Sequence, residues 1–423
     1  MFNRTTAQVA TIGDLTFESK VRADAISESG LRVYGVDRTD GLTPDAKYTS
    51  KDLGRYKVLR PGMFAYNPMR LNIGSIAYCT DKHVVGLVSP DYVVFGCKPG
   101  ALDPDFFSYA IKGPEWCQWT AAAGVGSVRV RIYYRELAKM LITVPTFAEQ
   151  KNIAHILGTL VDKIELNRRM NATLETMAGA LFQNWFVDFA PVRAKLDGRQ
   201  PAGLDAATAP LFPAHFQDSP LGHIPQGWEV RSLDQIAHFL NGLALQKYPP
   251  GDGATLPVIK IAQIRKGNSE GADRCNTKLA PQYIVEDGEV LFSWSGSLEV
   301  ELWCGGRGAL NQHLFKVTSP EFPKWFYYLW TLYHLDEFRL IAADKATTMG
   351  HIQRGHLTAA KVLVPPPALL KSMTHIMAPL IDQIIANRAQ SRTLATLRDA
   401  LLPKLLSGEI SVVAATSELE AVT

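Results

Sequence analysis

Two stretches of this chain gather side chains that donate hydrogen bonds well, and each lies just before a long apolar-periodic segment. The first, residues 127–139, carries four basic side chains against one glutamate. Its candidate contact residues are Ser127, Arg129, Arg131, Tyr133 and Arg135. The second stretch, residues 345–356, supplies Lys345, Thr348, His351, Gln353 and Arg354.

These residue types suit nucleic acid. Arg can bond the edge of guanine through two nitrogens or hold a phosphate, and Gln suits adenine. If the first stretch is a strand, Arg129 and Arg131 share one face, because side chains alternate with period two. The alternative is a pair of solvated loops with ordinary surface charge. We favour recognition, because the two stretches occupy equivalent places in an internal repeat.

Signatures of catalysis are missing from the sequence. It contains no G-x-x-x-x-G-K-[ST] phosphate loop. Asn67-Pro68-Met69 resembles only part of the N-P-P-[YF] loop of amino-methyltransferases, and a strand-to-turn Asn-Pro explains it better. The ten histidines are scattered without ligand spacing, and the five cysteines form no C-x-x-C pair. We therefore expect no catalytic residue and no metal site.

The second half of the chain repeats the first at a fixed offset. Val144-Pro145 aligns with Val364-Pro365, and Asn167-Arg168 aligns with Asn387-Arg388. This period is too long for a solenoid, so it predicts two domain-sized copies with approximate two-fold symmetry.

Each copy ends in a long helix. In residues 146–190 and 366–410, apolar residues recur three or four apart, which predicts one apolar stripe per helix. Pro145, Thr146 and Glu149 form a helix start with a capping box. Each helix could pack on its own domain. We expect instead that the two pair as an antiparallel coiled coil. The expected seam residues are Ile164, Asn167, Leu174, Ile384, Asn387 and Leu394.

The rest of the chain reads as strand-rich domains and connectors. Short β-rich runs separated by Gly, Pro, Asn and Asp predict strand-rich domains over residues 1–145 and 225–365. Residues 191–224 lack periodicity and read as a linker, and residues 411–423 read as a flexible tail. The fold class is α+β, with two strand-rich domains and two long helices in a pseudo-two-fold repeat.

Composition adds broad limits. The net charge of +3 is too small to establish a nucleic-acid partner, so the local basic stretches matter more than the sum. No apolar run approaches the roughly 20 residues of a membrane span, and the amino terminus lacks a signal-peptide pattern. The cysteine usage fits a reducing compartment, and we expect a cytoplasmic protein.

The order of domain and helix resembles the specificity subunit of type I restriction-modification systems. Several strings carry this resemblance: residues 149–154, 164–168 and 180–189 of the first helix, the entry string Pro225-Gln226-Gly227-Trp228, and residues 66–70, 288–297 and 309–315 of the domains. Nearly the whole chain is covered, excluding the tail.

The resemblance implies a division of labour. Each strand-rich part would be a target recognition domain that reads one half of a split target in double-stranded DNA. The helices would act as a spacer and would dock two methyltransferase subunits, with Trp185 and Phe186 as candidate contacts. Restriction and translocase subunits would complete the assembly. S-adenosylmethionine, ATP and Mg would belong to the partners, and this chain would be a non-catalytic recognition subunit.

Three other functions remain open at this stage. The chain could be the recognition subunit of a related system whose partner fuses methyltransferase and nuclease. It could be a self-contained methyltransferase, although the incomplete N-P-P-[YF] loop argues against this. It could also be a scaffold that only dimerises through its helices.

Overall fold

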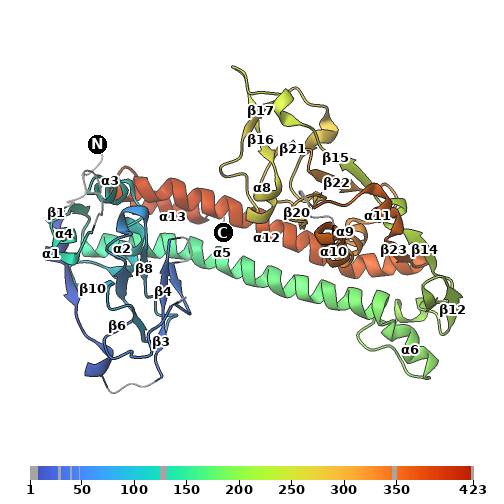
Figure 1. Cartoon of the computed structure of the whole chain (residues 1–423), viewed down its shortest axis with the longest axis horizontal. Helices are drawn as coiled ribbons and strands as arrows, with labels where there is room; N and C mark the ends of the chain where they lie inside the picture. The colour runs from blue at the N-terminus through green and yellow to red at the C-terminus, as the bar shows by residue number, and fades with distance from the viewer. Residues whose placement is uncertain are drawn as a thin grey trace. The chain divides into compact units, whose positions relative to one another are not determined.

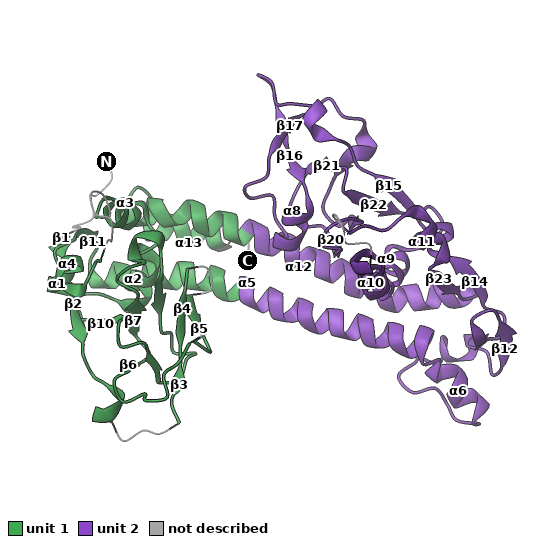
Figure 2. Cartoon of the chain, viewed as in Figure 1, with its two compact units in different colours: residues 1–163, 394–423 green, residues 164–393 purple. Residues whose placement is uncertain are grey.

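The computed structural model describes residues 8–26, 30–38, 41–46, 48–123, 131–344 and 350–420. The chain divides into two compact units, residues 1–163 with 394–423 and residues 164–393 (Figure 2). Each unit contains one strand-rich domain and parts of both long helices (Figure 1). The predicted α+β class is confirmed.

The first unit is built on a four-stranded antiparallel sheet with the order β2-β10-β7-β8. A second sheet has the order β3-β9-β6, in which β3 and β9 run parallel. The strands are β1 (Gln8–Thr11), β2 (Thr16–Ser19), β3 (Arg32–Val33), β4 (Gly35–Asp37), β5 (Gly41–Thr43), β6 (Lys57–Leu59), β7 (Met63–Tyr66), β8 (Ile76–Tyr78), β9 (Gly86–Val88), β10 (Val93–Cys97) and β11 (Leu141–Val144). The helices are α1 (Ile12–Leu15), α2 (Pro104–Ala110), α3 (Pro114–Ala122) and α4 (Tyr134–Leu137).

The second unit repeats this plan. Its four-stranded sheet has the order β15-β22-β19-β20, and the parallel pair β16-β21 is again extended by an antiparallel strand, β18. The strands are β14 (Glu229–Ser232), β15 (His238–Asn241), β16 (Thr255–Ile259), β17 (Arg274–Asn276), β18 (Ile284–Val285), β19 (Val290–Ser293), β20 (Val300–Leu302), β21 (Gly308–Leu310), β22 (Leu314–Thr318) and β23 (Lys361–Val364). The helices are α7 (Leu233–Ile236), α8 (Ile261–Lys266), α9 (Lys324–Tyr333), α10 (Leu335–Asp344) and α11 (Arg354–Ala359).

Both domains close on themselves in the same way. In the first, β1 pairs antiparallel with β11, and Gln8 lies opposite Val144. In the second, β14 pairs antiparallel with β23, and Glu229 lies opposite Val364. The strand that enters each domain therefore lies beside the strand that leaves it, immediately before the long helix.

The long helices are α5 (Phe147–Phe182) and α12 (Pro367–Ser407). The predicted capping box starts α5: the Thr146 amide donates to Glu149 Oε2 at 3.1 Å, and the Glu149 amide donates to Thr146 Oγ1 at 3.4 Å. Within the second unit, Asn167 bonds Gln390 and Asn171 bonds Ile384, so the helices run antiparallel.

The end of α5 is buried, which corrects one prediction. A π-helical turn, Gln183–Val187, carries Trp185 and Phe186, which are 1 % and 2 % exposed. Phe186 packs against Trp228 and Trp325 at ring-centroid distances of 5.3 and 6.2 Å. These aromatic side chains form the core of the second unit, so the prediction that they contact a partner is wrong.

The predicted linker, residues 191–224, and the predicted flexible tail, residues 411–423, both contain regular structure. Residues 191–224 include most of α6 (Ala190–Leu196) and a hairpin of β12 (Phe216–Ser219) with β13 (Gly222–Pro225). Phe212 is 2 % exposed, which ties this segment to the core. Val412–Glu420 forms α13, on which Ala415 is fully buried. Apolar side chains in these segments are buried although they follow no periodic pattern, so the sequence did not predict their burial.

Candidate DNA-recognition segments and the helix seam

In the second unit, the segment before α11 is clamped to the end of a sheet strand. Trp294 and Gly296 follow β19, and Ser295 forms an antiparallel bridge with His351. The Ile352 amide donates to the Trp294 carbonyl at 3.0 Å, and the Gly296 amide donates to the Gly350 carbonyl at 2.9 Å. On its other side the segment passes close to α10, where a Cβ at Gly350 would lie 2.3 Å from the Ala342 carbonyl oxygen.

The first unit contains the counterpart of one of these backbone bonds. Pro68 follows β7, the counterpart of β19, and its carbonyl accepts a hydrogen bond from the Ile132 amide at 2.9 Å. Ile132 and Ile352 occupy equivalent positions of the internal repeat, and each is 3 % exposed. We call them the anchor isoleucines, because each fixes its segment to the sheet by a backbone bond and a buried side chain.

The residues on either side of the anchors have more exposed side chains. Arg131 is exposed and Tyr133 is 48 % exposed. Gln353 is exposed and forms a capping box with His356: its backbone amide donates to His356 Nδ1 at 3.0 Å, and its side chain accepts from the His356 backbone amide. His351 is half-buried, with its ring edge-on to Trp294 at 6.3 Å. The structure thus presents four of the predicted contact residues at equivalent places.

The next position in each segment is held by its own domain. Tyr134 bonds Thr16 Oγ1 at 2.9 Å and packs on Phe95 at 6.2 Å. Its counterpart in the repeat, Arg354, donates to the Phe239 carbonyl at 3.3 Å and lies 5.7 Å from the Phe315 ring. We call Tyr134 and Arg354 the brace residues.

The brace contacts hold one predicted site residue partly against its own domain. The guanidinium of Arg354 contacts the sheet, but the residue remains exposed, so Arg354 stays a predicted DNA contact. Burial raises the pKa of the Tyr134 phenol.

The remaining predicted contacts divide into two groups. Ser127, Arg129, Lys345 and Thr348 lie outside the described residues. Arg135 is exposed in α4 and pairs with Glu136 at 3.0 Å. We predicted that Arg129 and Arg131 would share one face of a strand. The described part of this segment, residues 131–133, is not a strand.

A polar cluster lies on the seam of the helix pair in the second unit. Asn167 and Asn387 are 2 % and 4 % exposed. Asn167 Nδ2 donates to Ser391 Oγ at 3.3 Å, and Asn387 Nδ2 donates to Asn171 Oδ1 at 2.9 Å. These two bonds are counterparts in the internal repeat, so the internal two-fold relation passes through this cluster.

The apolar seam residues are buried to different degrees. Ile384 and Leu394 are fully buried, whereas Ile164 and Leu174 are partly exposed. Met170 and Met177, which share the predicted apolar stripe, are 39 % and 47 % exposed. The stripe of α5 is thus wider than the face that α12 and the second domain cover within this unit.

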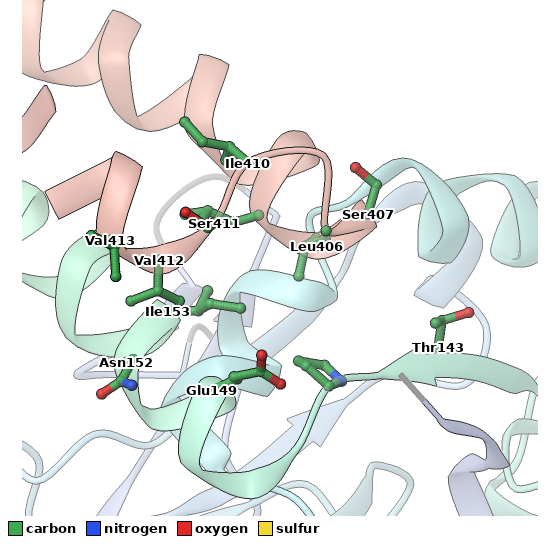
Figure 3. Close-up of a pocket in the computed structure, with 13 residues that line it drawn as sticks. Thr143, Glu149, Asn152, Ile153, Leu406, Ser407, Ile410, Ser411, Val412 and Val413 are labelled. Atoms are coloured by element: carbon green, nitrogen blue, oxygen red, sulfur yellow. The ribbon is translucent and has the colours of Figure 1, made fainter. Parts of the chain in front are cut away.

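A pocket beside α13 offers no catalytic arrangement. In Figure 3, Val412 of α13 lies beside Ile153 of α5, and the pocket is lined largely by aliphatic side chains. Its one carboxylate, Glu149, is occupied by the capping box. Among the residues that the structure describes, no three His, Cys, Asp or Glu side chains are grouped to hold a metal ion. No helix in this part of the chain is long and apolar enough to cross a membrane.

The anchors and braces were missed from the sequence. The offset of the repeat aligns Ile132 with Ile352 and Phe95 with Phe315, but this alignment does not show which residues they contact. The clamp to Trp294 and Pro68 required the structure, because those residues are far from the segments in the sequence.

Residues 225–394 match the type I restriction modification DNA specificity domain. The MjaIX specificity subunit of Methanocaldococcus jannaschii is 26 % identical over 317 residues, 73 % of this chain and 69 % of that protein. The HindI specificity subunit of Haemophilus influenzae is 20 % identical over 402 residues, 84 % of this chain and 88 % of that protein.

A solved structure has the same fold. The S subunit of a type I restriction-modification system from M. genitalium superposes with a TM-score of 0.55 at 14 % identity, covering 96 % of this chain and 97 % of that one. The chain is thus similar in sequence to specificity subunits of type I restriction-modification systems over most of its length.

Proposed function

We propose that this chain reads a split target in double-stranded DNA, one half with each strand-rich domain. The observation that carries this is the pair of equivalent recognition segments. Their anchor and brace contacts are alike, whereas the exposed residues differ: Arg131 and Tyr133 in one, His351 and Gln353 in the other. Segments with the same backbone and packing contacts but different exposed side chains are suited to two related modules that read different sequences.

The chemistry on DNA would belong to partner subunits. We propose that two methyltransferase subunits dock on the helices and that restriction and translocase subunits join them. S-adenosylmethionine, ATP and Mg would then bind the partners and not this chain. A recognition subunit needs to hold the methyltransferase over one adenine, which is flipped out of the duplex for reaction. Such a role requires access to DNA, and we propose the cytoplasm as its location.

The exposed apolar side chains of α5 support partner docking. Leu166, Met170 and Met177 recur at helical spacing and are 49 %, 39 % and 47 % exposed. Met side chains adapt to irregular partner surfaces. This face, in place of Trp185 and Phe186, is our candidate contact for a methyltransferase subunit.

Methylation-site sequencing of DNA from cells that carry this chain with its methyltransferase tests the proposal. We expect a split motif with one fixed gap. Methylation by the purified chain alone would instead identify a self-contained methyltransferase. An assembled complex without sequence preference would favour a scaffold. The fused methyltransferase-nuclease alternative is not favoured, because the relatives described above are type I specificity subunits.

A further inference from the structure

We infer that the residues flanking each anchor isoleucine determine sequence specificity: Arg131 and Tyr133 in the first unit, His351 and Gln353 in the second. This inference rests on the proposed DNA-reading function and narrows it to two positions per domain. The anchor isoleucines are positioning residues, which act through their neighbours.

The backbone geometry supports this assignment. In an extended segment, successive side chains point to opposite sides of the chain. When one side chain is buried, both of its neighbours therefore point to the other side. Ile352 is 3 % exposed and its amide is bound to Trp294, which turns both neighbours to the other side of the chain. Gln353 is exposed there, and His351 is half-buried with its ring edge-on to Trp294. Ile132 does the same for Arg131 and Tyr133 through its bond to Pro68.

The neighbouring positions also make contacts within their own domains. Tyr134 and Arg354 lie against Phe95 and Phe315, although Arg354 remains exposed. Arg135 pairs with Glu136, and its counterpart in the repeat is Gly355, which has no side chain to read a base. The flanking pair lies directly beside the backbone bond of each anchor, and its chemistry differs between the two segments.

The chemistry of the two pairs predicts different preferences. Arg131 presents a fork of donors that matches the O6 and N7 acceptors of guanine. Gln353 presents one donor and one acceptor, which match N6 and N7 of adenine. Tyr133 and His351 each present a polar group on an aromatic ring, one on either side of its anchor. Exchanging the pairs should therefore exchange preference at the base pairs that they contact.

The test is a reciprocal exchange in the complete complex with modification subunits. One variant carries Arg131→His with Tyr133→Gln, and the other carries His351→Arg with Gln353→Tyr. Binding is measured against duplexes in which every base pair of each half-site is changed in turn. We expect each variant to lose about ten- to hundredfold discrimination at one or two base pairs of its own half-site. The other half-site should keep its wild-type profile.

Two kinds of control make the outcome decisive. Arg199→His and Gln200→Tyr change similar exposed side chains in the segment between the domains and should leave both profiles unchanged. Ile132→Ala should lower discrimination at every base pair of the first half-site, because an anchor acts on every residue that it positions. Ile132→Val should keep the wild-type discrimination. Thermal melting of each complex identifies variants that do not fold, and for those Gln353→Ala or Arg131→Ala replaces the exchange.

The possible failures are separable. A wild-type complex without sequence preference would overturn the proposed function. A selective wild-type complex whose profile is unchanged by both exchanges would overturn this inference alone. Equal loss of discrimination in both half-sites would also overturn it, because such a loss would come from defective assembly of the complex and not from altered base contacts.

Discussion

At the residue scale, one buried tyrosine hydroxyl lacks a hydrogen-bond partner among the described residues. It belongs to Tyr66, which is fully buried at the end of β7. Leaving a buried donor without a partner costs about 1–3 kcal/mol. We expect Tyr66→Phe to leave the free energy of unfolding unchanged or raise it by about 1 kcal/mol, as measured by urea denaturation.

The matched substitution should act in the opposite direction. Tyr134→Phe removes the bond to Thr16 and should lower the unfolding free energy by about 0.5–1.5 kcal/mol. If Tyr66→Phe were the more destabilising of the two, the Tyr66 hydroxyl would have a hydrogen-bond partner in the folded protein.

A second prediction concerns pH. Arg392 on α12 bonds Asp287 at 2.6 Å, and this bond lowers the pKa of the Asp287 carboxyl. A lowered pKa means that the contribution to stability is present above the ordinary value of about 3.9 and is lost as the pH falls through the folded value. We expect Asp287→Asn to cost about 0.5–1 kcal/mol at pH 7, since the pair is partly exposed. In urea denaturation at several pH values, the deficit should shrink below about pH 4; a constant deficit would exclude the ionic contribution.

At the element scale, the Asn cluster should set the register of the helix pair. Asn167→Leu alone removes the bonds to Gln390 and Ser391 and should lower the unfolding free energy by about 1–3 kcal/mol. Asn167→Leu with Asn387→Leu gives the seam a more apolar character and should recover part of that stability. A buried seam Asn costs stability but fixes register, so the double variant should lose the single gap length.

Methylation-site sequencing checks the register prediction. We expect the double variant to methylate targets with more than one gap, or to methylate poorly. Unchanged activity at one unchanged gap would show that the cluster does not set register.

The helices and the repeat could be predicted from the sequence because their signals are local and periodic. The capping box at Thr146 and the seam position of Asn167 both follow from spacing. Spacing could not tell which side of α5 is covered: Trp185 was interpreted as a partner contact but is buried, and Met177, on the predicted apolar stripe, is 47 % exposed. It also could not identify the anchors, because the clamp joins Ile352 to Trp294, which lies far from it along the chain.

At the scale of the whole molecule, the length of the helices should set the gap between half-sites. The division between the compact units falls after Lys163 in α5 and after Thr393 in α12. Inserting one heptad at both places adds about 10.5 Å of helix while nearly keeping its phase. At about 3.4 Å per base pair, we expect the gap to grow by about three base pairs.

Sequencing of methylated sites checks this prediction, with both half-site sequences expected to stay the same. An insertion of one heptad in α5 alone is the control, and it should abolish selective methylation because the pairing with α12 is lost. An unchanged gap in the double insertion would mean that the helices do not act as the ruler.

The pairing of entry and exit strands has a consequence for how such proteins acquire new targets. Because β1 lies against β11 and β14 against β23, both covalent connections of a domain pass through one small patch. A domain can therefore be exchanged as a cassette by two crossovers, at sites distant in the gene but adjacent in space. The helices and their partners would be inherited unchanged, and a new target would arise in a single recombination event.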